Sequence, residues 1–200
     1  MRVLRVPFST NVERVALAAA HKRIAIAWVD VDPDDRSPVV ALSGQPLVPV
    51  LDAGGGDVLI DSMAIVARLE EVAPEPALWP ADPARRAEVD TFVDWFNLVW
   101  KGPPNRLADG GSEDAEADAA ALRGWLGRFE ALLEGRDHLM GDAFGAADVC
   151  AFPFLRYGVQ PPPPDDADPF HHVLAEHLPI AGRLPRLEAW VHRVDARPRA

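Results

Sequence analysis

The pattern of apolar and polar residues changes character near residue 80. Before that point, short runs rich in β-branched residues alternate with stretches whose apolar residues recur at helical spacing. The pattern predicts strands at residues 3–8, 24–30, 48–51 and 58–60, and helices at residues 11–22 and 62–71. Strands alternating with helices in this order indicate a small α/β unit.

After residue 80 the pattern is helical, interrupted by glycine and proline. Asp82-Pro83 is typical of an N-cap followed by a first-turn proline, and apolar residues recur behind it as far as Trp100. Acidic residues at the start of the next stretch favour a helix N-terminus, and the apolar face of that helix spans residues 122–133. Two further helices are expected at residues 146–156 and 184–194.

Proline-rich segments divide these parts. Residues 74–80 contain three prolines, and we take 74–82 as a linker between a first domain at 1–73 and an all-helical domain at 83–200. The Pro161–Pro164 run, followed by aspartates, is expected to form a surface loop.

Composition limits the classes of partner. The chain has 200 residues, 48% of them hydrophobic, and a net charge of −11, which argues against nucleic acid and anionic membranes as partners. No apolar run is long enough to span a membrane, and the first residues lack a signal-peptide core, so we expect a cytoplasmic protein. The single cysteine, Cys150, excludes an internal disulfide and is expected in the core. The histidines 171, 172 and 177 lack the spacing of a metal site, and we expect none.

A first candidate binding segment is Val48-Pro49. Proline cannot donate a hydrogen bond within a sheet, so Pro49 should begin a strand after a turn in which the Val48–Pro49 bond can be cis. The Val48 backbone would then be free to pair with an extended, peptide-like ligand.

A second candidate is the pair Asp61-Ser62, which opens a predicted helix. The two residues can act as a helix N-cap without any ligand. Alternatively, Asp61 can pair with the ammonium group of an amino acid while Ser62 and its N–H bind the carboxylate. Both interpretations remain open at this point.

Several segments, in this order and spacing, resemble the cytosolic glutathione S-transferase family, in its bacterial serine-type form. They are Pro7-Phe8-Ser9-Thr10-Asn11-Val12, Val48-Pro49, Asp61-Ser62, Leu78-Trp79-Pro80-Ala81-Asp82, Phe144 to Asp148, and Pro185-Arg186-Leu187-Glu188-Ala189-Trp190. The resemblance covers nearly the whole chain. It implies an α/β plus all-α fold, with an N-terminal thioredoxin-like domain followed by an all-helical C-terminal domain.

The resemblance also implies the chemistry. Family members bind glutathione as a co-substrate, with no other cofactor, and lower the pKa of its thiol so that the thiolate attacks a small hydrophobic electrophile. Each unit of pKa depression corresponds to about 1.4 kcal/mol of thiolate stabilisation. The family further implies a homodimer and a role in detoxification. Alternatives on the same scaffold are a thiol-dependent isomerase, dehalogenase or peroxidase, or a non-catalytic binding or interaction module.

Ser9 stands where serine-type members carry the catalytic hydroxyl. Thr10 is one residue away, and Asn11 can orient a hydroxyl group; any of the three can instead simply cap the following helix. The only tyrosine, Tyr157, lies far from the N-terminus, so a tyrosine-type enzyme is not expected.

The remaining site residues are expected to hold the substrates. In the family the Asp-Ser pair, here Asp61 and Ser62, grips the γ-glutamyl group, and the Val48-Pro49 step pairs with the peptide backbone. Leu47 stands where many relatives have a polar or basic residue, so Gln45 or Arg36 would have to bind the glycyl carboxylate. The side chains expected to line the electrophile pocket, although they can equally be core residues, are Trp95, Trp100, Phe96 and Tyr157.

Overall fold

The computed structural model describes residues 1–200, which form two compact units: residues 1–78 with 197–200, and residues 79–196. The division between Leu78 and Trp79 falls inside the predicted linker. Residues 197–200 lie with the first unit and not with the helical one, which differs from the expected boundary. The Ala200 N–H donates to the Ala16 carbonyl over 3.1 Å, and the Trp28 indole donates to the Ala200 carbonyl over 2.9 Å. These bonds attach the last residues to the first unit.

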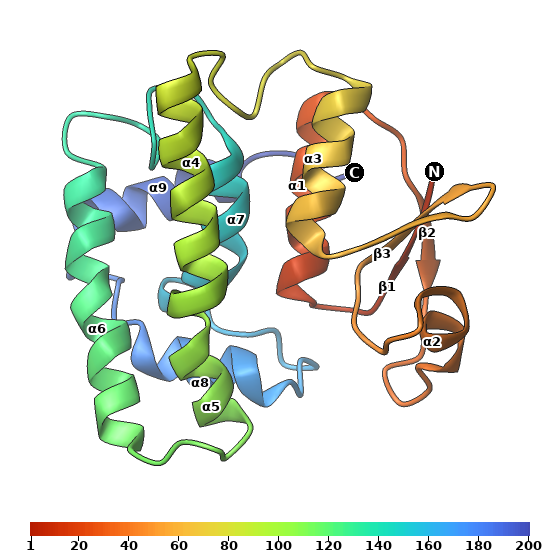
Figure 1. Ribbon diagram of the computed structural model, residues 1–200. Coiled ribbons are helices and arrows are strands. Elements are labelled where there is room, and N and C mark those ends of the chain that lie inside the picture. The colour runs from red at the N-terminus through yellow and green to blue at the C-terminus, as the bar shows by residue number, and fades with distance from the viewer. The chain divides into compact units, whose positions relative to one another are not determined.

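The first unit is built on a four-stranded sheet with the strand order β2-β1-β3-β4 (Figure 1). Strand β1 is parallel to β2 and antiparallel to β3, and β3 is antiparallel to β4. The elements are β1 (Arg2–Arg5), α1 (Thr10–Lys22), β2 (Ala27–Asp30), α2 (Ser37–Ser43), β3 (Val50–Gly54), β4 (Asp57–Ile60) and α3 (Ser62–Val72). This is the thioredoxin-like fold that the sequence predicts.

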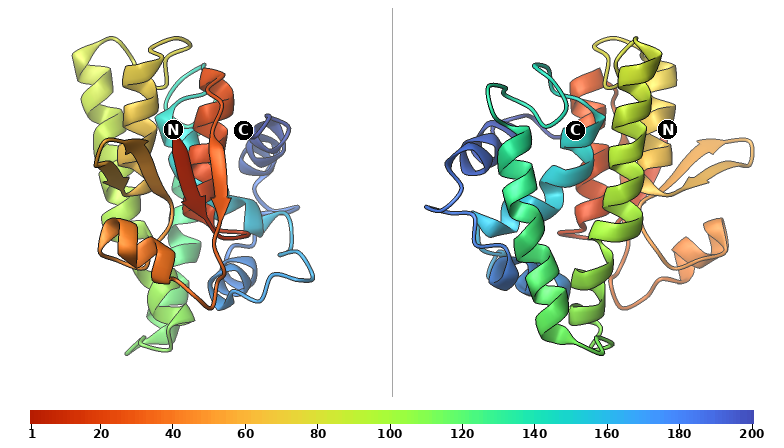
Figure 2. Two further views of the ribbon diagram at one scale, coloured as in Figure 1. Left: turned by 90° about the vertical axis from the view of Figure 1, so that its right-hand side faces the viewer. Right: turned by 60° about the vertical axis from the view of Figure 1, so that its left-hand side comes forward.

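Helices cover both faces of this sheet, and the strand residues alternate between them. Leu4 and Val50 are cross-strand partners and pack in a buried cluster with Val39 of α2. Their neighbours Val3 and Leu51, also paired and fully buried, therefore point to the opposite face. There α1 and α3 pack side by side, as Figures 1 and 2 show.

A buried lysine fixes the end of α1 to the chain that follows α3. The Lys22 side chain has no exposed surface and forms an ion pair with Glu70. Its ammonium group also donates to the carbonyls of Pro74 and Pro76, over 3.0 and 2.6 Å. Because a buried ammonium must be paired and hydrogen-bonded, this set of contacts fixes where the proline-rich segment leaves α3.

The second unit is helical throughout. Its elements are α4 (Pro83–Trp95), the π-helical turn η1 (Phe96–Trp100), α5 (Gly102–Ala108), α6 (Ala115–Leu132), α7 (Ala146–Leu155), the 3-10 turn η2 (Arg156–Gly158), α8 (Pro169–His177) and α9 (Pro185–Asp195). Helix α7 packs against α4, α8 and α9, and all ten of its residues are buried. No helix in the structure is both long enough and apolar enough to cross a membrane.

Several boundaries differ from those expected. Strand β1 ends at Arg5, β2 begins at Ala27, and β3 begins at Val50, because only these residues find partners in the sheet. The short helices α2, α5 and α8 were not predicted, since each has few residues and a proline in its first turn. The Pro161–Pro164 run lies outside any helix or strand, as expected, but Asp166 behind it is buried and not on the surface.

The buried carboxylate of Asp148 holds the start of α7. It accepts hydrogen bonds from the N–H groups of Gly145 (2.9 Å) and Leu139 (3.0 Å) and from the Trp190 indole (2.7 Å). Burial raises the pKa of Asp148, although these three donors and the nearby His138 act in the opposite direction. The aspartate half of a capping box is therefore present, with glycine at the N-cap.

Replacing Asp148 with alanine should lower the free energy of unfolding by about 3–5 kcal/mol, because three donors, two of them in buried hydrogen bonds, lose their acceptor. Urea titration monitored by tryptophan fluorescence measures this, since five of the six tryptophans lie in the second unit. Asp142→Ala, at an exposed position in the loop before α7, is the control and should change the free energy by about 0.5 kcal/mol or less. Equal effects of the two changes would contradict this role.

Candidate functional site

The register of the sheet brings the three predicted segments to one end of the first unit. Val50 pairs with Ile60 on one side and with Leu4 on the other. Val48-Pro49 directly precedes β3, and Asp61-Ser62 directly follows β4. The residues that lead to Ser9 directly follow β1. The same end of the sheet therefore holds all three segments.

Ser9 is the N-cap of α1. Its Oγ accepts one long hydrogen bond, 3.4 Å, from the Val12 N–H. That bond uses Oγ as an acceptor only, so the hydroxyl hydrogen of Ser9 remains available for another group. The preceding residue, Phe8, has a φ of +60°, a conformation that is uncommon for non-glycine residues and that occurs at functional turns. Capping and catalysis are therefore compatible roles for this hydroxyl.

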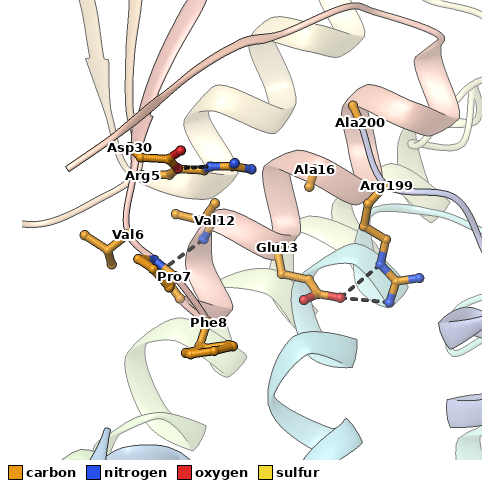
Figure 3. Close-up of a pocket in the computed structure, with 11 residues that line it drawn as sticks. Arg5, Val6, Pro7, Phe8, Val12, Glu13, Ala16, Asp30, Arg199 and Ala200 are labelled. Atoms are coloured by element: carbon orange, nitrogen blue, oxygen red, sulfur yellow. Dashed lines mark hydrogen bonds and ion pairs between the residues drawn. The ribbon is translucent and has the colours of Figure 1, made fainter. Parts of the chain in front are cut away.

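Ser9 also lines a cleft of about 370 Å³ within the first unit (Figure 3). Two ion pairs lie in its wall: Arg5 with Asp30 at 2.7 Å, and Arg199 with Glu13 at 2.8 Å. Phe8 supplies an aromatic ring that is 39% exposed. The cleft thus combines apolar surface with charged groups beside the candidate hydroxyl.

The next two residues are placed differently. Thr10 is 6% exposed in the first turn of α1, so its side chain belongs to the interior. The Asn11 Oδ1 accepts hydrogen bonds from Arg14 (3.3 Å) and from the Ser62 hydroxyl (3.4 Å). Asn11 therefore forms a hydrogen bond with the hydroxyl group of Ser62.

Asp61 and Ser62 form the start of α3. The Asp61 Oδ1 accepts from the N–H groups of Met63 and Ala64, each over 2.9 Å, and Asp61 adopts a φ of +75°. Its second oxygen, Oδ2, has no partner within the chain, and the residue is exposed. Ser62 is 3% exposed, and its Oγ accepts from the buried guanidinium of Arg14 over 3.1 Å. Asp61 therefore caps the helix with one oxygen and leaves the other available to a ligand.

The Val48–Pro49 bond is cis, as the sequence allows. Val48 lies just outside β3, and neither its N–H nor its C=O forms a backbone hydrogen bond with the rest of the chain. An extended ligand can therefore pair with this residue.

Gln45 holds the loop before this step. Its Oε1 accepts from the Leu47 N–H, and its Nε2 donates to the Leu47 carbonyl (2.9 Å) and the Ser43 hydroxyl (3.1 Å). Binding a ligand through this amide would break the loop's own bonds. The Leu47 side chain is left 72% exposed. Arg36 donates through Nε to the Pro33 carbonyl, and its two terminal nitrogens are not used.

The tryptophans expected at the electrophile pocket lie in the aromatic cluster of the second unit. Trp95 is half-buried and meets Trp125 edge to face, with ring centroids 5.7 Å apart. Trp100 is fully buried and stacks on Phe96 at 4.4 Å. In this unit Trp100 is thus a core residue with no surface to offer a ligand, whereas Trp95 keeps an exposed edge.

The histidines take structural positions. His171 is buried, forms a 2.7 Å contact with Asp166 and stacks on Tyr157, and His172 contacts the Asp166 backbone carbonyl at 2.9 Å. No three histidine, cysteine or acidic side chains are grouped to hold a metal ion. Cys150 is buried and forms no disulfide.

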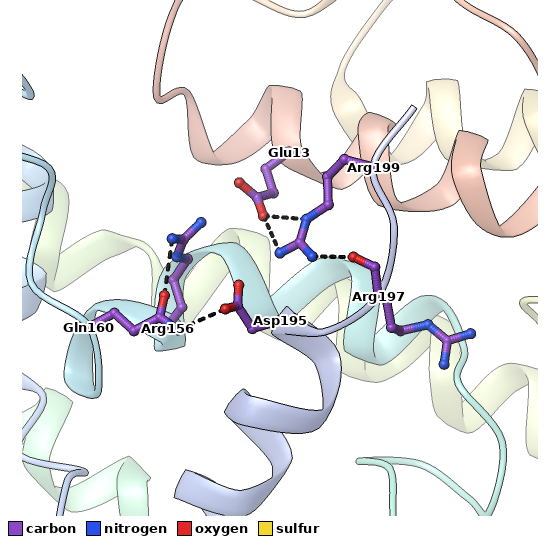
Figure 4. A network of polar contacts seen from close by, with 6 residues as sticks. All are labelled: Glu13, Arg156, Gln160, Asp195, Arg197 and Arg199. Atoms are coloured by element: carbon purple, nitrogen blue, oxygen red, sulfur yellow. Dashed lines mark hydrogen bonds and ion pairs between the residues drawn. The ribbon is translucent and has the colours of Figure 1, made fainter.

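Sequence reasoning missed Glu13, Arg14 and Arg199. Glu13 and Arg14 lie within the predicted first helix, where charged residues are usually exposed, and nothing in the sequence links Arg199 to α1. Figure 4 shows Arg199 bound to Glu13 and to the Arg197 carbonyl. It also shows a separate chain of contacts in the second unit, in which Gln160 accepts from Arg156 and donates to Asp195.

Comparisons with known proteins agree with this arrangement. Models of the N-terminal and C-terminal domains of glutathione S-transferase match residues 4–77 and 89–198. Maleylacetoacetate isomerase of Pseudomonas aeruginosa is 33% identical over 174 residues, or 76% of this chain and 80% of that protein. FtsZ-localized protein A of Caulobacter vibrioides is 30% identical over 162 residues, or 72% of this chain and 71% of that protein.

A solved structure gives the same result. A glutathione S-transferase from Rhodospirillum rubrum F11 superposes with a TM-score of 0.74 and 28% identity, covering 98% of this chain and 88% of that chain. The two domain models match the two units in order, and the relatives are matched over more than two thirds of the sequence. This chain therefore belongs to the glutathione S-transferase family and is a glutathione transferase-like enzyme.

Proposed function

We propose that the first unit binds glutathione and that Ser9 donates a hydrogen bond to its thiolate, which then attacks a small electrophile with apolar character. The observation that carries this proposal is that Ser9 lines a cleft and that its hydroxyl hydrogen is available to a ligand. The Ser9 Oγ only accepts one long hydrogen bond, from the Val12 N–H. The N-terminus of α1 adds a partial positive charge at the same place, and both effects favour the thiolate over the thiol.

The other groups suit the rest of the tripeptide. The unpaired Val48 backbone can form two hydrogen bonds with the cysteinyl residue, as a neighbouring strand would. The free oxygen of Asp61 can pair with the γ-glutamyl ammonium, and the start of α3 at Ser62 suits a carboxylate. Arg36, with two unused guanidinium nitrogens, can bind the glycyl carboxylate more readily than Gln45.

A second candidate function is favoured by the 33% identity to a maleylacetoacetate isomerase. In that case the thiolate adds to an activated carbon–carbon double bond, the resulting single bond rotates, and elimination restores both the thiolate and the double bond. Glutathione is then not consumed. The same Ser9 hydroxyl would serve both reactions. Only the transfer reaction consumes glutathione, so a loss of thiol during turnover distinguishes it from the isomerisation.

Glutathione binding is the first test. We expect calorimetric titration to show binding in the millimolar range or tighter. S-hexylglutathione should bind at least about tenfold more tightly, because its alkyl chain buries apolar surface. Cysteinylglycine, which lacks the γ-glutamyl group, is the control and should bind more weakly than glutathione. The absence of heat and of thermal stabilisation with both glutathione compounds would overturn the proposal.

The Ser9→Ala variant tests the catalytic role. We expect kcat to fall about 10- to 100-fold, because the thiolate loses a hydrogen bond to a charged group, while the Kd for glutathione changes less than about threefold. Turnover should be followed both as thiol loss and as isomerisation of an activated cis double bond. Thr10→Ser, at the neighbouring hydroxyl, is the control. Unchanged turnover in Ser9→Ala would contradict the assignment, and no turnover in the unmodified protein would favour a non-catalytic module.

We also propose a cytoplasmic homodimer. Glutathione, the proposed co-substrate, is abundant and reduced in the cytoplasm. Leu47 supports self-association, because its side chain is 72% exposed while Gln45 fixes its backbone on both sides. A large apolar side chain held rigidly in water is typical of a contact surface.

Leu47→Asp should weaken such a dimer about 100-fold or more, because a two-fold axis loses the buried side chain twice. Light scattering after size exclusion, over a range of protein concentrations, measures the mass. Leu47→Met keeps the apolar character and should leave the dimer intact. A monomeric mass for the unmodified protein at all concentrations would contradict the dimer.

A further inference from the structure

Arg14 is a buried cation that the proposed reaction has not yet used. It lies on α1 and is 1% exposed, among the buried side chains of Val12, Val15 and Leu17. Removing a guanidinium from water costs several kcal/mol, and an apolar side chain of similar size often replaces a buried charge without loss of stability. Packing of α1 alone therefore does not account for an arginine at this position.

Its contacts connect it to the start of α3. One terminal nitrogen, NH1, donates to the Ser62 Oγ over 3.1 Å and lies 3.3 Å from the Asn11 Oδ1. The Ser62 hydroxyl in turn donates to the same Asn11 oxygen over 3.4 Å. The three side chains form a closed triangle between the first turn of α1 and the first residue of α3.

The triangle determines how Ser62 can use its hydroxyl. Because the guanidinium occupies an acceptor position of Oγ, the hydroxyl hydrogen must point elsewhere. In this structure it points to Asn11 over 3.4 Å, which is longer than O–H···O hydrogen bonds usually are. A carboxylate oxygen arriving at the start of α3 would be a stronger acceptor and could take this hydrogen.

The charge of Arg14 also favours binding of a carboxylate at the start of α3. Asp61 places a carboxylate on the N-cap of α3, where it offsets the partial positive charge that would otherwise attract an anion. The Arg14 guanidinium is a full positive charge one hydrogen bond behind Ser62. It favours a second carboxylate at this helix end despite the presence of Asp61.

We infer that Arg14 is a positioning residue for the γ-glutamyl α-carboxylate: it orients the Ser62 hydroxyl toward that group and adds positive charge behind it. The inference rests on the proposed glutathione site. It extends that site to a residue that does not touch the ligand and is shielded from solvent.

The test compares two ligands by calorimetry: glutathione, and its analogue in which 4-aminobutanoate replaces the γ-glutamyl residue and the α-carboxylate is therefore missing. Arg14→Met should raise the Kd for glutathione about tenfold or more and the Kd for the analogue less than about threefold. In Ser62→Ala, adding Arg14→Met should cause a smaller further loss than in the unmodified protein, because the hydroxyl that Arg14 orients is gone and only the charge of Arg14 is removed. Arg14→Lys keeps the charge but not the planar guanidinium. Its Kd for glutathione should therefore lie between those of the unmodified protein and Arg14→Met.

A purely structural role for Arg14 predicts equal losses for the two ligands, and that result would overturn the inference. If Arg14→Met does not fold, as judged by circular dichroism and thermal melting, Arg14→Gln and Arg14→Lys give the same comparison. Failure of the unmodified protein to bind glutathione would instead reject the proposed function, so the two failures are distinguishable.

Discussion

The register of β3 between β1 and β4 is the constraint on which the site depends. Leu4, Val50 and Ile60 align across the three strands, so the turns beyond them meet at one end of the sheet. A slip of one residue would turn Val50 from the α2 face to the α1 face and move the Val48 backbone away from Asp61. The buried pairs Leu4–Val50 and Val3–Leu51, on opposite faces, exclude such a slip, and packing of the core therefore also fixes the binding geometry.

In the proposed glutathione site, two helix starts would provide the chemistry at that end. At Ser9 and at Asp61 a side-chain oxygen satisfies the N–H groups of the first turn, and in both cases part of the capping group remains unused. Capping and ligand binding, which the sequence leaves open as alternatives, are therefore compatible roles for these two residues. A cap holds its own side chain in place, and this fixed position is what a binding or catalytic group requires.

The sequence predicted the elements with a clear period or a strong cap, such as α1, α3, α4 and α7, because those signals are local. It did not predict α2, α5 and α8, whose few residues carry little periodicity and whose first turns contain proline. Within the site, Ser9, Val48 and Asp61 could be named from motifs and their order. The positions of Arg14 and Arg199 could not, because their partners lie 48 and 186 residues away along the chain. For Trp100, helical spacing alone could not distinguish a pocket wall from a core residue, and the structure places it in the core.

The attachment of residues 197–200 to the first unit affects how the protein is made. Arg199 and Ala200 line the cleft beside Ser9, although nearly all of that unit precedes residue 79. During synthesis the sheet and its three helices can assemble early, because all of their residues precede residue 79. The cleft gains its last wall only after the whole helical unit has left the ribosome. A nascent chain therefore carries an incomplete site, and completion of the site coincides with the end of translation of these residues.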